Sequence, residues 1–320
     1  MVRSPWQRDQ LQESTNRPQS PTIAQFNARR NVDKARYAQY AGAISCPTCI
    51  CPQLKEVSMV EEKTIRVRNG MFETKLRSDG SGAPLLFLHG AGGLRGWEPF
   101  LAELAQHFTV YAPAHPGFET STGIEHIDDI IDMVVYYNDL LDALHLESVH
   151  VLGHSLGGMI GAELAALSPH RVRKLVLANA VGLWLDEQPV ADFFAMTPDQ
   201  LGLALWHDPT SAVAQAMMAV PQDEKAQLEA YVTRMQHLAS AGKFLWPIPD
   251  KGLKKRIHRI IAPTCIIWGQ SDGLTPVVYA QEFQQRIPSA QVTIMPQCGH
   301  MPMYEDPAGF VSAVVGFLQS

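Results

Sequence analysis

The chain has 320 residues, of which 46% are hydrophobic and 18% are charged, a composition typical of a globular protein with one large core. The formal net charge of -6 provides no broad positive field, which argues against sequence-independent binding of nucleic acid. No apolar run reaches the roughly 18 residues that a membrane-spanning helix needs, so no membrane insertion is expected. We therefore expect the partner to be a small molecule.

Residues 1–58 differ from the rest of the chain because they are rich in Gln, Arg, Asn, Ser and Pro and show no sustained apolar period. We expect this polar extension to be weakly ordered. It lacks the apolar run of a secretory signal, and the chain has an odd number of cysteines, five, so we expect a cytoplasmic protein. Cys46, Cys49 and Cys51 lie close together without a second ligand pair nearby, and we predict neither a metal nor a cofactor.

From Lys63 onward, short apolar runs alternate with longer amphipathic ones, which is typical of a mostly parallel sheet flanked by helices. The first two strands are joined by Asn69-Gly70, a strong hairpin signal. The eight predicted strands are 63–67, 71–77, 84–89, 108–112, 148–153, 174–178, 264–268 and 291–295. The predicted helices are 97–107, 126–145, 159–167, 277–286 and the stretch after Pro307.

Between Val181 and about Arg259 the strand pattern stops, and a helical, proline-divided segment takes its place. We therefore predict a core formed by 59–182 and 260–320, with a helical cap inserted at 183–259. The apolar residues of this segment are numerous enough to roof a pocket, although we expect most of them to form the cap's own interior. They are Phe193, Phe194, Met196, Leu203, Trp206, Met217, Met218, Phe244, Leu245 and Trp246.

Ser155 lies in the motif Gly153-His154-Ser155-Leu156-Gly157, directly after a predicted buried strand and directly before a predicted helix. This context is that of a nucleophile elbow, in which a strained turn projects a serine hydroxyl from the sheet. The glycines on either side of the turn avoid Cβ clashes. We predict that Ser155 is a nucleophile; the alternative is a helix-capping serine in a Gly-rich turn.

A serine hydroxyl is a poor nucleophile unless a base removes its proton and a third group orients that base. Asp272 follows the predicted strand 264–268, and His300 follows the predicted strand 291–295. Either residue alone would be interpreted as an ordinary loop residue. In the chain order Ser, Asp, His they predict a catalytic triad with Ser155.

Acyl transfer also needs backbone donors for the developing oxyanion. The glycine-rich stretch from Leu88 to Gly93 follows a predicted buried strand and lets the backbone approach a substrate closely. We predict that the N–H groups of Ala91 and Leu156 form the oxyanion hole. The alternative is a flexible loop without this role.

With these motifs, residues 60–320 resemble the α/β-hydrolase superfamily, specifically its cap-bearing branch of esterases, epoxide hydrolases and carbon-carbon bond hydrolases. The resemblance is carried by His89-Gly90, Gly153-His154-Ser155, Asp272, Gly299-His300 and the stretch His115 to Phe118. It implies an eight-stranded α/β-hydrolase fold, no metal or organic cofactor, and a two-step acyl-enzyme mechanism. Epoxide hydrolases and haloalkane dehalogenases of this fold carry aspartate at the nucleophile position, so Ser155 disfavours those activities.

The leading hypothesis is a carboxylesterase-like serine hydrolase acting on a small-molecule ester. A carbon-carbon bond hydrolase of ring-cleavage-type diketones is an alternative, but those enzymes typically carry Gly-Pro-Gly after the His-Gly pair and Trp after the catalytic histidine. This chain has Gly92-Gly93-Leu94 and Met301 there. A ligand receptor on the same fold is a second alternative. Lys254-Lys255-Arg256 could recognise an acidic substrate, although a solvated helix face is the favoured interpretation, and the oligomeric state stays open.

Overall fold

The computed structural model describes residues 60–248, 250–288 and 290–320. The expectations for residues 1–58, including the cysteines Cys46, Cys49 and Cys51, lie outside the described residues. Cys265 and Cys298 are buried free thiols. Among the helices that the structure describes, none is long and apolar enough to cross a membrane. Within the same ranges, no group of three or more His, Cys, Asp or Glu residues is placed to hold a metal ion.

In the described part of the chain, eight strands form one mostly parallel sheet, as the sequence predicted. Its order is β1-β2-β4-β3-β5-β6-β7-β8; β2 is antiparallel to β1 and β4, and the other neighbours are parallel. Because parallel strands point the same way, the loops after their carboxyl ends meet at one edge of the sheet. The strands are β1 Glu61–Val67, β2 Phe72–Asp79, β3 Pro84–Leu88, β4 Thr109–Pro113, β5 Val149–His154, β6 Val172–Ala178, β7 Thr264–Gly269 and β8 Gln291–Met295.

The predicted hairpin joins β1 to β2, with Val67 paired to Phe72. The connection is a short 3-10 turn, η2 (Arg68–Gly70), in which Asn69 has φ 56° and Gly70 has φ 90°. Asparagine and glycine are the residues that tolerate left-handed backbone best, which explains why this dipeptide makes the turn.

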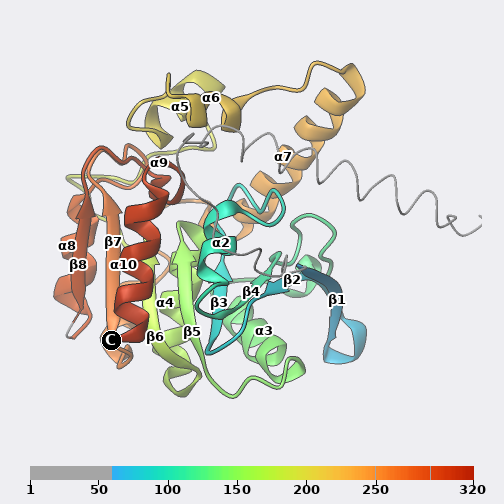
Figure 1. Ribbon diagram of the computed structural model, residues 1–320, viewed down its shortest axis with the longest axis vertical. Coiled ribbons are helices and arrows are strands. Elements are labelled where there is room, and N and C mark those ends of the chain that lie inside the picture. The colour runs from blue at the N-terminus through green and yellow to red at the C-terminus, as the bar shows by residue number, and fades with distance from the viewer. Residues whose placement is uncertain (1–59, 249, 289) are drawn as a thin grey trace, which may run out of the picture. The chain divides into compact units, whose positions relative to one another are not determined.

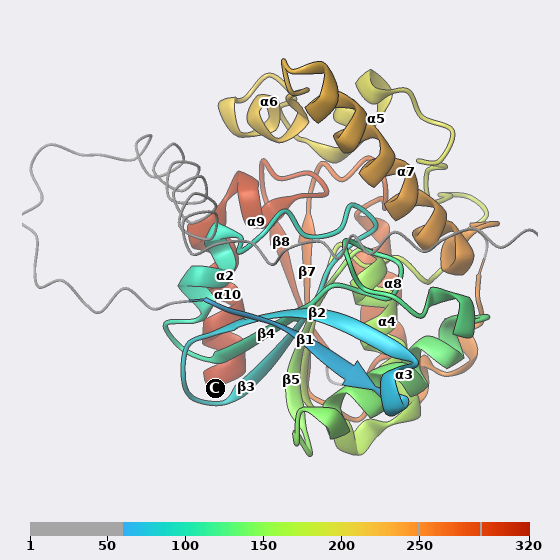
Figure 2. The same ribbon diagram turned by 90° about the vertical axis from the view of Figure 1, so that its right-hand side faces the viewer.

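Helices cover both faces of the sheet because successive strand side chains point to opposite sides. Leu86 and Val151 pack into a core with α3, α4 and α8, whereas Leu85 and Leu152 pack with α2 and α10 (Figures 1 and 2). The helices are α2 Pro99–Leu104, α3 Ile130–Ala143, α4 Leu156–Leu167, α5 Pro198–Leu205, α6 Ala212–Met218, α7 Glu224–Leu245, α8 Val278–Arg286, α9 Pro302–Glu305 and α10 Pro307–Gln319. Short 3-10 turns lie at η3 Ile124–His126, η4 Pro169–Arg171, η5 Leu253–Lys255 and η6 Ile257–Arg259.

The helix α3 is shorter than the predicted span 126–145. It starts at Ile130 because the Asp129 side chain accepts hydrogen bonds from the N–H groups of Ile131 and Asp132, which caps the helix at that point. His145, beyond its other end, has φ 56° and cannot continue a right-handed helix. The apolar period predicts the helix correctly, but capping by Asp129 and the backbone turn at His145 determine where the helix begins and ends.

Between β6 and β7 the described residues form α5, α6 and α7 without a strand (Figure 1). The Leu205 carbonyl at the end of α5 accepts from the N–H of His300 after β8, at 2.7 Å. On α7, His237 bonds to Gly92, which follows β3. This helical insertion, residues 183–259, thus contacts the loops at the carboxyl edge of the sheet. That it acts as a cap over a pocket stays a prediction.

Candidate active site

Ser155 lies at the turn between the end of β5 and the start of α4, in a backbone conformation (φ 55°, ψ -117°) that is strained for a residue with a side chain. Two glycines make this sharp turn possible. A Cβ on Gly153 would lie 2.3 Å from the Gly157 carbonyl oxygen, and a Cβ on Gly157 would lie 2.0 Å from that of Leu88. The turn therefore has the geometry of the predicted elbow, and both glycines are required by backbone contacts.

Asp272, after β7, and His300, after β8, are in direct contact. His300 Nδ1 and Asp272 Oδ2 lie 2.8 Å apart, and their side chains are 3% and 0% exposed. The structure thus brings together two residues that the sequence separates by an entire strand and helix. A buried, hydrogen-bonded carboxylate fixes the orientation of an imidazole and stabilises its protonated form.

Several hydrogen bonds hold the Asp272 carboxylate in place. Its Oδ2 accepts from Asn179 Nδ2 and from Thr275 Oγ1, each at 2.6 Å, and its Oδ1 accepts from the N–H groups of Leu274 and Thr275. Burial raises the pKa of Asp272, but the charge of His300 and the hydrogen bonds from His300, Thr275 and Asn179 outweigh it, so the pKa is lowered. The carboxylate is therefore ionised at neutral pH.

His154, the residue before Ser155, connects the elbow to the loop that carries His300. Its Nε2 donates to the His300 carbonyl at 2.8 Å, and the two rings lie 5.0 Å apart. Burial, reinforced by the charge of His300, lowers the pKa of His154 to about 3, so this ring is neutral. Within the described structure, the Ser155 hydroxyl makes no hydrogen bond to His300. Such catalytic bonds are often long in unliganded enzymes and tighten when substrate binds.

The loop after β3, residues 89–93, lies against the nucleophile. A Cβ on Gly90 would lie 3.1 Å from the Ser155 Cβ, closer than ordinary van der Waals contact, so the loop backbone lies directly beside the nucleophile. Among the described residues, neither the Ala91 nor the Leu156 N–H donates a hydrogen bond. Leu156 is the first residue of α4, where the N–H groups have no partner within the helix. Both groups are thus free to bind an oxyanion, and their assignment to the hole stays a prediction.

Two stacked histidines, His89 and His115, hold the backbone of this loop through hydrogen bonds. The His89 ring donates through Nδ1 to the Gly90 carbonyl at 2.8 Å and accepts through Nε2 from the His115 N–H at 3.0 Å. The His115 Nε2 donates back to the His89 carbonyl at 2.9 Å, and its Nδ1 contacts the Tyr137 hydroxyl. Burial lowers the pKa of His89 to about 4 and holds the pKa of His115 well below its usual range, so both rings are neutral, each with one donor and one acceptor nitrogen.

Sequence reasoning missed other residues that position the site. Asn179, which follows β6 and has φ 46°, bonds to Asp272 and also to the Gly299 carbonyl. Glu305 accepts from the N–H groups of Gly299 and His207, both at 2.7 Å, and so ties the His300 loop to the segment after α5. The only sequence feature that could have pointed to Asn179 is its place directly after a buried strand. No sequence feature points to Glu305 as a residue of the site.

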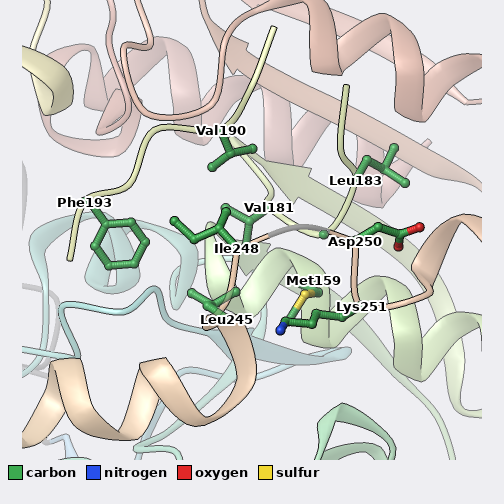
Figure 3. Close-up of a pocket in the computed structure, with 10 residues that line it drawn as sticks. Met159, Val181, Leu183, Val190, Phe193, Leu245, Ile248, Asp250 and Lys251 are labelled. Carbon is green, nitrogen blue, oxygen red and sulfur yellow. The ribbon is translucent and has the colours of Figure 1, made fainter. Parts of the chain in front are cut away.

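A pocket begins one helical turn beyond the nucleophile (Figure 3). Met159 on α4 lines it, as does Val181, whose N–H donates to the Ser155 carbonyl at 3.2 Å. Ser155 itself is not among the lining residues, which are Met159, Val181, Gly182, Leu183, Val190, Phe193, Leu245, Ile248, Asp250 and Lys251. The cavity measures about 10 Å³, roughly the space that one water molecule needs, and is too small to hold an acyl group.

The helical insertion supplies most of the pocket lining, but largely through other residues than the apolar ones singled out in the sequence. Phe193 and Leu245 line the pocket, but Leu203 and Trp246 are 68% and 55% exposed and cannot form its roof or the insertion's interior. Trp206, Phe244 and Leu245 are buried, as expected for the insertion's interior, but most of the first half of α7 is exposed, so part of the insertion's apolar surface stays uncovered.

In the basic stretch 254–256, Lys254 and Lys255 are exposed on the 3-10 turn η5, in line with the favoured interpretation, whereas Arg256 is partly buried and departs from it. Arg256 forms a bidentate ion pair with the buried Glu163 of α4, at 2.7 and 2.5 Å, and Lys254 pairs with Asp250 at 2.9 Å. Both charges have intramolecular partners and do not face the pocket as free groups. Lys251 does line it, and within the described residues it has no ion-pair partner.

Comparison with known proteins identifies the family. The model of the alpha/beta hydrolase fold matches residues 83–307. The chain is 28% identical to a 2-hydroxy-6-oxo-2,4-heptadienoate hydrolase of Pseudomonas putida, over 78% of this chain and 94% of the relative. It is 30% identical to a 2-hydroxy-6-oxononadienedioate/2-hydroxy-6-oxononatrienedioate hydrolase of Pseudomonas putida, over 79% of this chain and 95% of that protein.

Among solved structures, a meta-cleavage product hydrolase from Pseudomonas fluorescens superposes with a TM-score of 0.65 at 22% identity, covering 80% of this chain and 97% of the other. At this identity the likeness shows the fold alone. The family match covers most of the chain and includes Ser155, Asp272 and His300. We conclude that the chain belongs to the alpha/beta hydrolase fold family and is a hydrolase.

Proposed function

We propose that the protein is a serine hydrolase that cleaves carboxylic esters through an acyl-enzyme intermediate. The observation that supports this most directly is the buried Asp272–His300 pair, at 2.8 Å, beside a strained serine turn. The loop 89–93 packed against that serine supplies a free backbone N–H at the same place. A nucleophile, an oriented base and oxyanion donors are the complete set of groups that ester hydrolysis needs.

In this mechanism His300 removes the proton of Ser155 Oγ, which attacks the ester carbonyl carbon. The N–H groups of Ala91 and Leu156 bind the oxyanion of the tetrahedral intermediate. His300 then returns the proton to the departing alkoxide as the carbon-oxygen bond breaks. A water molecule, deprotonated by His300, attacks the acyl-enzyme and releases the acid, while Asp272 stabilises the imidazolium in each half-reaction.

Carbon-carbon bond hydrolysis is the second candidate, and two observations favour it. The named relatives act on 2-hydroxy-6-oxo dienoates, which carry a carboxylate. Lys251 lines the mostly apolar pocket and offers a positive charge to such a group, while Asp250, which also lines it, is paired with Lys254. Against it, the chain has Gly92-Gly93-Leu94 and Met301 where those hydrolases typically carry Gly-Pro-Gly and Trp. We therefore place it second.

The deciding experiment measures two substrate classes with wild type and Ser155→Ala: p-nitrophenyl esters from acetate to palmitate, and 2-hydroxy-6-oxo-2,4-heptadienoate. We expect ester turnover that falls at least ~10³-fold in Ser155→Ala, because the nucleophile is lost. Turnover of the dienoate without turnover of esters would establish the second candidate. Labelling of Ser155 by a fluorophosphonate without turnover of either class would favour the ligand receptor instead.

A further inference from the structure

His237 on α7 is a buried histidine that the mechanism above does not use. It is 5% exposed and is the first buried residue along α7, whose preceding turns face solvent. Its ring reaches two loops of the sheet's carboxyl edge at once. Nδ1 lies 3.0 Å from the Gly92 carbonyl, and Nε2 lies 3.2 Å from the N–H of Glu119. One imidazole of the helical insertion therefore bridges the loops that follow β3 and β4.

The two contacts define the state of the ring. The Gly92 carbonyl can only accept, so Nδ1 carries the proton; the Glu119 N–H can only donate, so Nε2 is the bare acceptor. Burial lowers the pKa of His237, against the hydrogen bond to Gly92 and the charge of Glu119, which raise it. The negative charge of Glu119 is itself neutralised by Arg77 at 2.7 Å and Lys75 at 3.5 Å. The neutral ring fits this site, and the protonated one does not.

The ring also packs tightly on the loop after β3. A Cβ on Gly93 would lie 2.6 Å from the His237 Cε1, so the imidazole lies directly on the backbone of that glycine. Phe118 packs on the ring from the other loop, with centroids 5.0 Å apart. Gly92 is the residue after Ala91, whose N–H we assign to the oxyanion hole. His89 and His115, which belong to the core, hydrogen-bond to the backbone of this loop at Gly90 and His89, and His237 of the helical insertion hydrogen-bonds to it at Gly92.

We propose that His237 is a positioning residue that holds the loop 89–93 in its catalytic conformation and makes that conformation depend on the docking of α7. The proposal rests on the proposed function in that it assigns the Ala91 N–H to the oxyanion hole. It assigns no contact between His237 and substrate. A displacement of α7 would break the hydrogen bond to Gly92 and so remove this support from the loop.

The test compares three variants. His237→Ala removes both contacts, and His237→Asn keeps a side-chain N–H at the place of Nδ1. Gln236→Ala is the matched control because the neighbouring Gln236 also docks α7, through the Gly117 carbonyl at 3.1 Å and the Glu119 carbonyl at 3.3 Å, and has no contact with Gly92. The measurements are the rate at which a fluorophosphonate labels Ser155 and the hydrogen exchange of amides 88–94.

We expect the fluorophosphonate to label His237→Ala at least ~10-fold more slowly than wild type. Complete removal of one oxyanion donor lowers the rate on the order of 10²-fold or more, and a displaced donor should lose part of that effect. Hydrogen exchange of amides 88–94 should be faster in His237→Ala than in wild type. The labelling rate of His237→Asn should return most of the way to the wild-type rate, and that of Gln236→Ala should stay within about twofold of it. The proposal is overturned if His237→Ala shows the same labelling rate and hydrogen exchange as wild type. It is also overturned if Gln236→Ala loses as much as His237→Ala. If wild type itself is neither labelled nor active, the proposed function fails, and the exchange data alone decide whether His237 holds the loop.

Discussion

At the scale of single residues, the most informative feature is how completely the Asp272 carboxylate is enclosed. Its side chain is fully buried and accepts hydrogen bonds from Asn179, Leu274, Thr275 and His300. A buried carboxylate without such partners would take up a proton. Here the partners keep it charged, and a charged group at this position is what a catalytic imidazole requires when it accepts a proton.

Replacing Asp272 with asparagine should therefore lower kcat far more than it raises KM. We expect a loss on the order of 10³- to 10⁴-fold, because the amide cannot stabilise the imidazolium. Thr275→Val is the matched control, since it removes the Thr275 hydroxyl, which contacts Oδ2 and, at 3.4 Å, His300 Nδ1, and leaves the hydrogen bond between Asp272 and His300 in place. Steady-state ester kinetics give both constants. A loss of less than tenfold in Asp272→Asn would show that this carboxylate is not part of the catalytic machinery.

At the scale of elements, the important contact is between the first turn of α4 and the end of β3. The backbone of Gly157 approaches the Leu88 carbonyl so closely that the helix start and the strand end act as one unit. Ser155 and the loop 89–93 are attached to these two elements. The relative position of nucleophile and oxyanion loop thus depends on a glycine that takes part in no chemistry.

Gly157→Ala should destabilise the protein by about 2 kcal/mol or more, because the added Cβ meets backbone that cannot rotate away. Gly316→Ala is the matched control on α10, where an added Cβ meets nothing within 4 Å. That change should be neutral or stabilise by up to about 1 kcal/mol. Chemical denaturation of both variants measures the difference. Equal free energies of unfolding would contradict the crowding argument.

At the scale of the whole molecule, the buried neutral histidines link stability to pH. The pKa of His89 is about 4 and that of His154 about 3, in both cases lowered mainly by burial. In the unfolded chain a histidine titrates near ~6.5. Below that pH these histidines are protonated in the unfolded state but remain neutral in the folded state. The free energy of unfolding therefore falls as pH falls. Above it, these groups contribute nothing to the pH dependence.

We therefore expect the histidines to leave stability flat between about pH 7 and about pH 8 and to make it decline below about pH 6.5, by up to ~1.4 kcal/mol per pH unit for each such histidine. Glu98 and Glu305, whose pKa values burial raises, act in the opposite direction and reduce this decline. Urea unfolding across this range tests the prediction. A free energy of unfolding that did not change between pH 7 and about pH 5.5 would contradict it.

Local patterns were enough to predict the architecture. Alternating apolar runs predicted the strands and most helices, and Asn69-Gly70 predicted the hairpin, because each depends only on neighbours in sequence. The elbow around Ser155 was predictable for the same reason, since a strand, two glycines and a helix define it within a few residues. Helix ends were harder: α3 starts where Asp129 caps it, a choice between competing side chains that periodicity does not contain.

The sequence by itself determined the fold class, the strained serine turn and the chain order Ser155, Asp272, His300. Only the tertiary structure decided which side chains surround them. Asn179 reaches Asp272 across 93 residues, and His237 reaches Gly92 across 145. Such contacts depend on which loops meet at the carboxyl edge of the sheet and on how the helical insertion docks there. Patterns with a period of two or 3.6 residues report which face of an element is buried, and carry no information about the partner that covers it.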